Sequence, residues 1–257
     1  MHLGLVTYNL AKDWDIPTII EKCTATGFEG VELRTTHAHG VEVSLGPEER
    51  HRVKLQFENS PIQLVGLGSI FEYHSPEPET VRRNIEGTKE YVKLAHDVGA
   101  PGVKVRPNGF PPPEAGVPRE KTLEQIGLAL RECGEFAKDY GVEIRLEVHG
   151  PETCKLPYIH QIMEIADHDN VFVCWNSNQT DVDENGSVER NFNLVKDKIR
   201  LVHITELYRE EYPWRELFGL LKASGYQGFC LAEIPESSEP ERLMRYYRAL
   251  FKAYGGD

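Results

Sequence analysis

Short apolar runs rich in β-branched residues alternate with longer amphipathic segments along the whole 257-residue chain. The short runs predict eight strands, at residues 2–8, 30–34, 62–68, 102–106, 142–148, 171–176, 200–205 and 228–234. The segments between them carry apolar residues at three- and four-residue spacing, which is typical of helices that bury one face. A regular alternation of strand and helix predicts a parallel sheet covered by helices.

Four glycines mark the ends of expected helices. Gly27, Gly99, Gly141 and Gly225 each follow a helical pattern and precede a strand, as glycine at a helix C-terminus does. Eight strand–helix units in a chain of this length favour one closed (β/α)8 barrel over residues 1–257, an α/β fold. An open doubly wound sheet is the alternative, but no G-x-G-x-x-G follows the first strand to support dinucleotide binding.

Composition narrows the partners that we expect. The formal net charge is −12, so the surface repels phosphate backbones and nucleic acid is not an expected partner. The apolar runs are far shorter than the roughly 20 residues of a membrane span, and the first residues carry no secretory signal pattern. The five cysteines are scattered without a C-x-x-C pair, which argues against a disulfide framework or zinc ribbon and favours a reducing cytoplasm.

The expected loops differ in length at the two ends of the strands. Long loops leave the strands at 35–47, 69–79, 107–118 and 177–187, whereas those entering strands are short. The long loops therefore belong to the C-terminal mouth, where barrel enzymes keep their sites. The proline-rich loop 107–118 suits a stiff lid or a plain surface excursion equally well.

Polar residues at strand ends need a reason, because buried parallel strands are nearly all apolar. Glu147, Asn176, His203 and Glu233 lie near the ends of four successive strands, about one strand–helix unit apart. They should therefore lie at a similar height around the mouth. Two carboxylates, an imidazole and an amide oxygen could together bind Mn²⁺, Mg²⁺ or Zn²⁺.

In their settings these residues resemble the xylose isomerase-like TIM-barrel superfamily of sugar and sugar phosphate isomerases and epimerases. The resemblance covers essentially the full chain. It rests on the motifs VELR at 31–34, LEVHG at 146–150, VHITE at 202–206 and AEIP at 232–235. These motifs are short, so they identify the superfamily better than the substrate.

The resemblance implies one divalent metal, held by Glu, Asp, His and Glu at these strand ends. Glu147 and Glu233 would then be metal ligands and also the acid–base pair that moves a proton between adjacent carbons, with His203 a further ligand. Related epimerases often place a substrate-binding arginine near the position of Arg209. A solvated surface charge is the other interpretation of Arg209.

The fourth ligand departs from this pattern. Where the family usually has Asp, followed three residues later by His, this chain has Asn176 and Gln179. An amide oxygen can bind a cation but carries no charge, so metal affinity should fall, or the site should work without metal. Asp181 and Asp183 in the next loop are candidate substitutes, although a solvated turn explains them more simply.

Strand alternation also points charged residues into the barrel. The parity that directs Glu147 inward directs Arg145 inward too, and the same argument applies to Glu32 and Lys104. Such a buried ionic layer is costly unless every charge is paired. We expect these charges to orient Glu147 or to bind substrate oxygens, unless a bulge lets one or two reach solvent. His149 is a further candidate for substrate contact.

The sequence thus predicts a metal-assisted isomerase or epimerase acting on a small sugar, keto-sugar or related polyol by 1,2-proton transfer. An inosose-type dehydratase would use the same glutamates and metal, and a degenerate barrel would bind sugar without turnover. An endonuclease-IV-like role in DNA repair shares the fold, but it needs several metals, more ligands and a basic groove.

Exposed aromatic residues offer the one hint of a homo-oligomer. Those expected at the surface are Tyr208, Tyr212, Trp214, Tyr246 and Tyr247. They could cover an interface between subunits, but packing within the chain explains them equally well.

Overall fold

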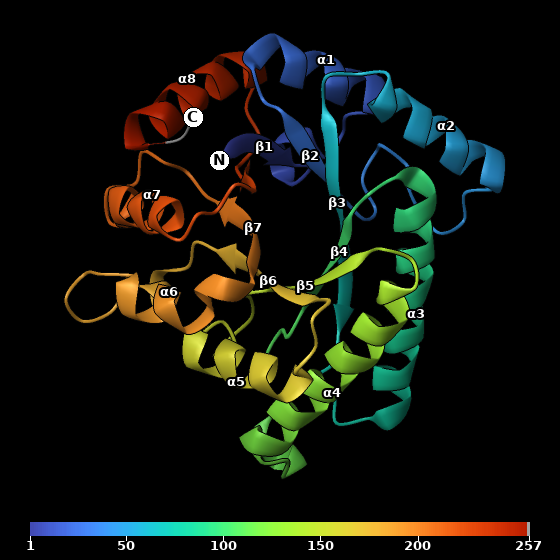
Figure 1. Ribbon diagram of the computed structural model, residues 1–257, viewed down its shortest axis with the longest axis vertical. Helices are drawn as coiled ribbons and strands as arrows, with labels where there is room; N and C mark the ends of the chain where they lie inside the picture. The colour runs from blue at the N-terminus through green and yellow to red at the C-terminus, as the bar shows by residue number, and fades with distance from the viewer. Residues whose placement is uncertain (256–257) are drawn as a thin grey trace.

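The alternating pattern of the sequence folds into a ring of strands surrounded by helices, seen in a computed structural model that describes residues 1–255 (Figure 1). The strands are β1 (His2–Val6), β2 (Gly30–Arg34), β3 (Gln63–Glu72), β4 (Gly102–Arg106), β5 (Glu143–Glu147), β6 (Val171–Asn176), β7 (Ile199–Ile204) and β8 (Phe229–Ala232). The α-helices are α1 (Ile16–Thr26), α2 (Pro47–Glu58), α3 (Pro78–Val98), α4 (Arg119–Lys138), α5 (Leu156–Ala166), α6 (Glu189–Val195), α7 (Trp214–Ala223) and α8 (Pro240–Tyr254).

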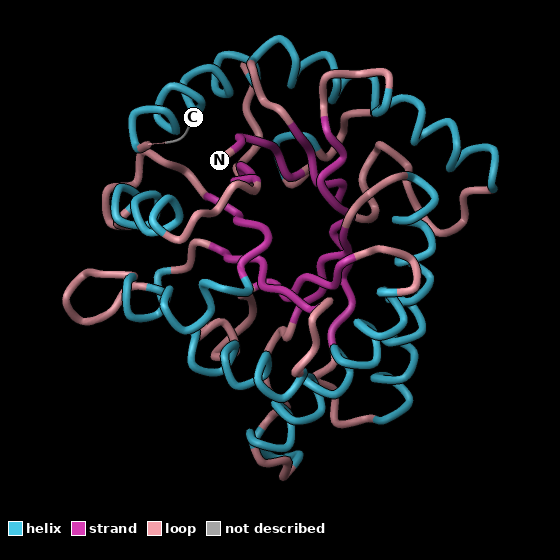
Figure 2. The backbone as a smooth tube through the Cα atoms, in the orientation of Figure 1, coloured by secondary structure: helices cyan, strands magenta, loops and turns pink. Residues whose placement is uncertain are grey.

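The sheet is parallel and closed. Each strand pairs with the next along the chain, and β8 pairs with β1, so no strand has a free edge. Figure 2 shows this ring of strands inside the ring of helices. The prediction of a (β/α)8 barrel is therefore confirmed.

The glycine signals also behave as expected. Gly27, Gly99, Gly141 and Gly225 have φ angles of 73°, 81°, 64° and 77°. These lie in the left-handed region that glycine enters without steric cost, and the chain reverses there from helix into the next strand. β3 differs most from expectation, because it continues to Glu72 through an irregular pairing with β4 between Gly68 and Glu72, whereas β1 and β8 each end two residues earlier than expected.

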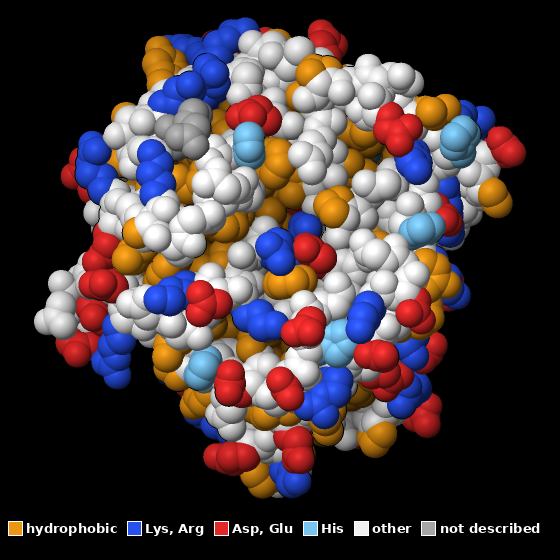
Figure 3. Space-filling view, in the orientation of Figure 1, with side chains coloured by type: hydrophobic (Ala, Val, Ile, Leu, Met, Phe, Trp, Pro, Cys, Tyr) orange, Lys and Arg blue, Asp and Glu red, His pale blue; other side chains and the backbone are white. Residues whose placement is uncertain are grey.

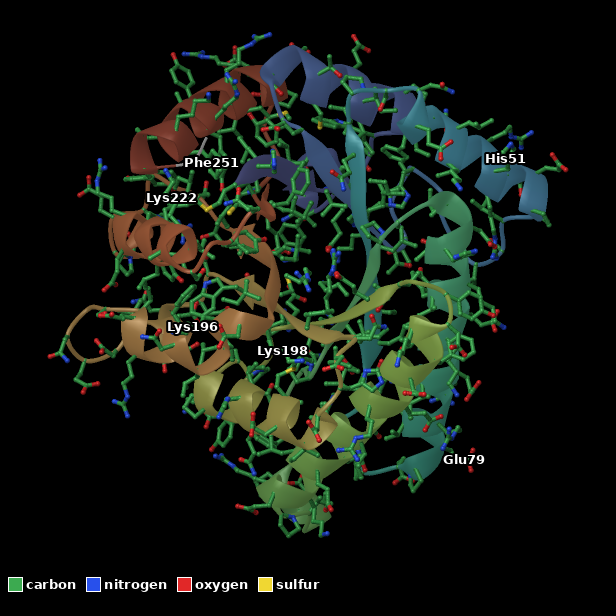
Figure 4. The ribbon with its side chains drawn as sticks, in the orientation of Figure 1. His51, Glu79, Lys196, Lys198, Lys222 and Phe251 are labelled. Carbon is green, nitrogen blue, oxygen red and sulfur yellow. The ribbon has the colours of Figure 1, made fainter. Side chains whose placement is uncertain are left out.

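Two groups of apolar side chains fill the molecule. The larger lies between the strands and the helices and includes Val81, Ile85 and Val92 of α3. Figure 4 shows Phe251 on the inner side of α8, where its ring packs edge-on against Phe218 of α7. The smaller group lies within the barrel. It consists of Val6, Val65, Cys174, Leu201 and Leu231.

Three of the five aromatic residues expected at the surface are buried, so that prediction was wrong for them. Tyr212, Trp214 and Tyr247 pack within the chain, whereas Tyr208 and Tyr246 are more than 60% exposed, at 63% and 62%. Most of the aromatic residues expected at an interface between subunits therefore pack inside the subunit. A homo-oligomer stays a prediction.

The outer surface is strongly charged, with acidic and basic side chains interspersed on the face that Figure 3 shows. None of the helices within residues 1–255 combines the length and apolar character needed to cross a membrane.

Candidate functional site

The four strand-end residues come together at the C-terminal mouth of the barrel. Glu147 and Asn176 are the last residues of β5 and β6, and Asn176 stands directly opposite His203 in the register of β6 with β7. Glu233 follows β8, and its backbone N–H donates to the carbonyl of Ile204 at the end of β7. Closure of the sheet therefore brings four distant segments to one place.

Three of the four side chains form a tight cluster. One donor atom from each of Glu147, His203 and Glu233 lies within 4.8 Å of the other two. His203 stands in the middle, with Nδ1 3.3 Å from Oε1 of Glu147 and 3.8 Å from Oε2 of Glu233. Glu147 and His203 are buried, whereas the side chain of Glu233 is 18% exposed and reaches solvent.

This cluster fits a divalent cation. The buried Nδ1 of His203 has no hydrogen-bond partner, although it faces two carboxylates. One imidazole nitrogen and two carboxylate oxygens are a common donor set for zinc and related ions, with a further position left for water or substrate. The chemistry of the donors, together with this unpartnered nitrogen, matches a metal site.

Asn176 does not complete the set in the way the family pattern implies. Its amide nitrogen, not its oxygen, is directed to Oε1 of Glu147, at 3.5 Å. The candidate substitutes lie elsewhere: Asp181 is buried against the hydroxyl of Tyr212, and Asp183 accepts from backbone N–H groups in its own turn. Neither aspartate belongs to the cluster, so their proposed substitution was wrong.

Glu32 lies behind His203. Its Oε1 is 3.4 Å from Nε2 of His203, and the carboxylate is buried at the centre of the barrel. A carboxylate behind a ligating histidine fixes the ring orientation and leaves the other nitrogen free for a metal. Within residues 1–255, neither Nε2 of His203 nor either oxygen of Glu32 makes a hydrogen bond, so this contact is one between charges, and Glu32 does not line the open cavity.

Lys104 and Arg145 stand opposite each other in the register of β4 with β5, but their side chains run in opposite directions. Nζ of Lys104 donates to Oε2 of Glu147 at 2.7 Å, towards the mouth. Arg145 instead donates to Glu143 at the start of β5 and to the carbonyl of Val65. The ionic layer is buried as predicted, but the contacts of Arg145 do not support its expected substrate-binding role.

The two glutamates are held in different electrostatic states. Burial alone would raise the pKa of Glu147, but Lys104 and His203 hold it well below its usual range. Burial also raises the pKa of Glu233, and there His203 compensates only in part. Such a split between two carboxyl groups is common where one accepts a proton and the other donates one.

An open cavity of about 350 Å³ lies beside the cluster, within the usual range for small-molecule sites. Its lining consists of Tyr8, Asn9, Ser177, Gln179, Thr205, Glu206, Arg209, Glu211, Tyr212, Trp214, Glu233 and Pro235. Of the residues predicted for the site, Glu233 and Arg209 line it. Arg209 is half exposed and pairs with Glu206 at 3.0 Å.

Several lining residues were missed by sequence reasoning. Tyr8 and Asn9 follow β1, Ser177 follows β6, and Thr205 follows β7. Each stands within a few residues of a strand end, and that position was the available signal.

His149 lies at the mouth but not in the lining of the cavity. Its Nδ1 is 3.0 Å from Oδ1 of Asn108, and Nδ2 of Asn108 donates to Oε2 of Glu72. Burial lowers the pKa of His149. These contacts fasten the base of the loop 107–118, Phe110 packs against Tyr158, and the loop is exposed from Pro112 onwards.

Comparison with known proteins begins with the sequence. Residues 20–254 match the family described as "Xylose isomerase-like TIM barrel". An inosose isomerase from Halalkalibacterium halodurans is 23% identical over 245 residues, which cover 88% of this chain and 83% of that protein.

Solved structures show the same architecture. A D-psicose 3-epimerase from Clostridium cellulolyticum H10 has a TM-score of 0.81 at 16% identity, covering 100% of both chains. The IolI protein, solved with a bound zinc atom, has a TM-score of 0.76 at 17% identity, covering 99% of this chain and 96% of that one. At these identities the likeness establishes the fold.

Proposed function

Because this chain belongs to the xylose isomerase-like TIM-barrel family, we propose that it is a sugar isomerase or epimerase acting on a small keto-sugar or cyclic polyol ketone. It would remove a proton next to the carbonyl group and return one, to the adjacent carbon as an isomerase or to the opposite face of the same carbon as an epimerase. The names of its relatives support this substrate class, since they include an inosose isomerase and a ketose epimerase.

One observation carries the proposal: Glu147 and Glu233 both face Nδ1 of His203, and Glu233 lines the adjoining cavity. Proton transfer between adjacent carbons needs one group to remove a proton and a group to return it within hydrogen-bond reach of the substrate. Glu233 reaches the cavity from β8, and Glu147 lies deeper on β5. A ketone bound between them would present its reacting carbons to both carboxyl groups.

Glu147, His203 and Glu233 would hold a divalent cation. When bound, that cation would supply a Lewis acid that polarises the carbonyl group and favours loss of the neighbouring proton. The charge of Glu32 would help to hold the ring of His203 in place, and Arg209 would bind a substrate oxygen at the cavity rim. We propose Mn²⁺, Mg²⁺ or Zn²⁺ as the candidate ions.

The test is an assay of E147Q and E233Q on a panel of ketoses and inososes, with added Mn²⁺ and after chelation. Both variants keep the size of the side chain but lose the carboxylate, so turnover should fall about 10²- to 10⁴-fold. Glu29→Gln is the matched control, because Glu29 is exposed and lies before β2, at the far end of the barrel. Its turnover should equal that of the wild type.

Three results would change this assignment. Full activity in either glutamate variant would remove that residue from the reaction. Products that have lost water would identify a dehydratase. Binding of the sugars without any conversion by the wild type would identify a non-catalytic sugar-binding barrel.

A further inference from the structure

A lysine reaches into the cluster of metal-binding donors. The side chain of Lys104 is 5% exposed, that of Glu147 is 2% exposed, and Nζ lies 2.7 Å from Oε2 of Glu147. The other oxygen of the same carboxylate faces Nδ1 of His203. Glu147 is therefore shared between an ammonium group and the position that a metal would take.

A second feature also reduces the negative charge that the cluster offers to a metal. Asn176 carries no charge and directs an amide N–H at Glu147, where a carboxylate would add a charge and an acceptor. Glu147 and Glu233 bring two negative charges to the cluster, and Lys104 offsets one of them. Lys104 thus makes the donor set less negative than its carboxylates alone suggest, and Asn176 makes it less negative than a set with Asp at that position.

We propose that Lys104 is an internal cation that competes with a divalent metal for Glu147, so that this site binds metal weakly and Lys104 neutralises Glu147 when metal is scarce. The ammonium group of Lys104 is buried, and it repels a second cation placed on the same carboxylate. The inference deepens the proposed function and rests on it only for taking this cluster as the reaction centre.

The experiment measures the Kd of Mn²⁺ and of Zn²⁺ by calorimetry, on protein stripped with a chelator. Lys104→Met should bind metal about 10- to 100-fold more tightly than the wild type, the range by which residues behind metal ligands alter affinity. Asn176→Asp should also tighten binding, because it adds a charge beside Glu147. The double variant K104M/N176D should bind most tightly of all.

Lys104→Gln guards against a misfolded variant, since it removes the charge but keeps a hydrogen-bond donor for Glu147. Lys54→Met is the matched control: it removes a half-exposed lysine that pairs with Glu58 on α2, far from the cluster in the sequence, and it should leave the Kd unchanged. Glu147→Gln should weaken metal binding. If a stripped Lys104 variant is unfolded, added Mn²⁺ should restore its circular dichroism and raise its Tm.

Equal or weaker metal binding in both Lys104 variants would overturn the proposal, as would a double variant that binds no metal. These readouts do not involve turnover. A chain that converts no sugar would therefore refute the proposed function and leave the result for Lys104 standing.

Discussion

Among the charged residues described inside the barrel, each side chain points towards a partner of opposite charge. Lys104 turns towards Glu147, Arg145 turns towards Glu143, and His203 stands against Glu32. Removing one partner of a buried pair leaves an uncompensated charge, which costs roughly 3–5 kcal/mol. The position of such a residue in its strand therefore determines that it is buried. The location of its oppositely charged partner determines where its side chain points.

For Arg209, kinetics can separate a role in substrate binding from a role as a solvated surface charge. It lines the cavity but is half exposed and already paired with Glu206. If it binds a substrate oxygen, Arg209→Ala should raise KM about tenfold, the equivalent of one charge-assisted hydrogen bond of ~1.5 kcal/mol, with kcat little changed.

Steady-state kinetics on the converted sugar measures this effect. Arg82→Ala, which removes a similarly exposed arginine from α3, is the control and should leave KM unchanged. An unchanged KM in the Arg209 variant would assign that arginine to the solvated surface.

The buried carboxyl group of Asp181 should make the free energy of unfolding depend on pH. Burial raises its pKa well above the ordinary value, while the N–H of Asn178 and the hydroxyl of Tyr212 act against that rise. The folded state therefore holds a proton that the unfolded state has released. Stability should fall as pH rises from about 4 towards the folded pKa, by up to ~1.4 kcal/mol per pH unit.

Asp181→Asn should remove this loss, so urea unfolding measured from pH 4 to 8 should give a flatter stability curve for the variant. Asp183 offers a contrast of opposite sign, because backbone N–H groups of Ser187 and Asn185 lower its pKa. Asp183→Asn should lose stability above pH 4. Parallel curves for wild type and Asp181→Asn would contradict the account.

At the scale of the strands, small residues make room for the buried charges. A Cβ on Gly102 of β4 would lie 2.5 Å from Nε of Arg145. Gly102→Ala should therefore push the guanidinium away from Glu143 and lower the free energy of unfolding by about 1–3 kcal/mol, as overpacking does.

Gly219→Ala is the matched control on α7, where an added Cβ meets no atom within 4 Å. Helix propensity should make that variant more stable by about 0.5–1 kcal/mol. Chemical denaturation measures both changes. Equal stabilities for wild type and Gly102→Ala would show that the interior of the barrel is looser than its contacts indicate.

The elements were largely predictable from the sequence, because the strand pattern and the glycine stops are local signals. The end of β3 was not, since its last residues follow an irregular pairing with β4 that only the folded neighbour determines. Alternation predicted that Lys104 and Arg145 are buried, but it carries no information on rotamer direction. The cluster was predictable because polar residues at strand ends are also a local signal. The other residues that line the cavity depend on loop conformation, which local patterns do not give.

For the whole molecule, barrel closure joins the beginning and the end of the chain at one site. Tyr8 after β1 and Glu233 after β8 line the same cavity because β1 and β8 pair. The net charge of −12 still predicts that nucleic acid is not a partner. The cytoplasmic location likewise stays a prediction.

Proton transfer by the two glutamates is the central claim, and exchange with heavy water tests it most directly. In D₂O the wild-type protein should introduce deuterium, seen by NMR, at the carbon next to the carbonyl of its sugar. E147Q and E233Q should slow that exchange at least ~10²-fold, and E29Q should not. Conversion of the sugar with no deuterium in the product would contradict the account.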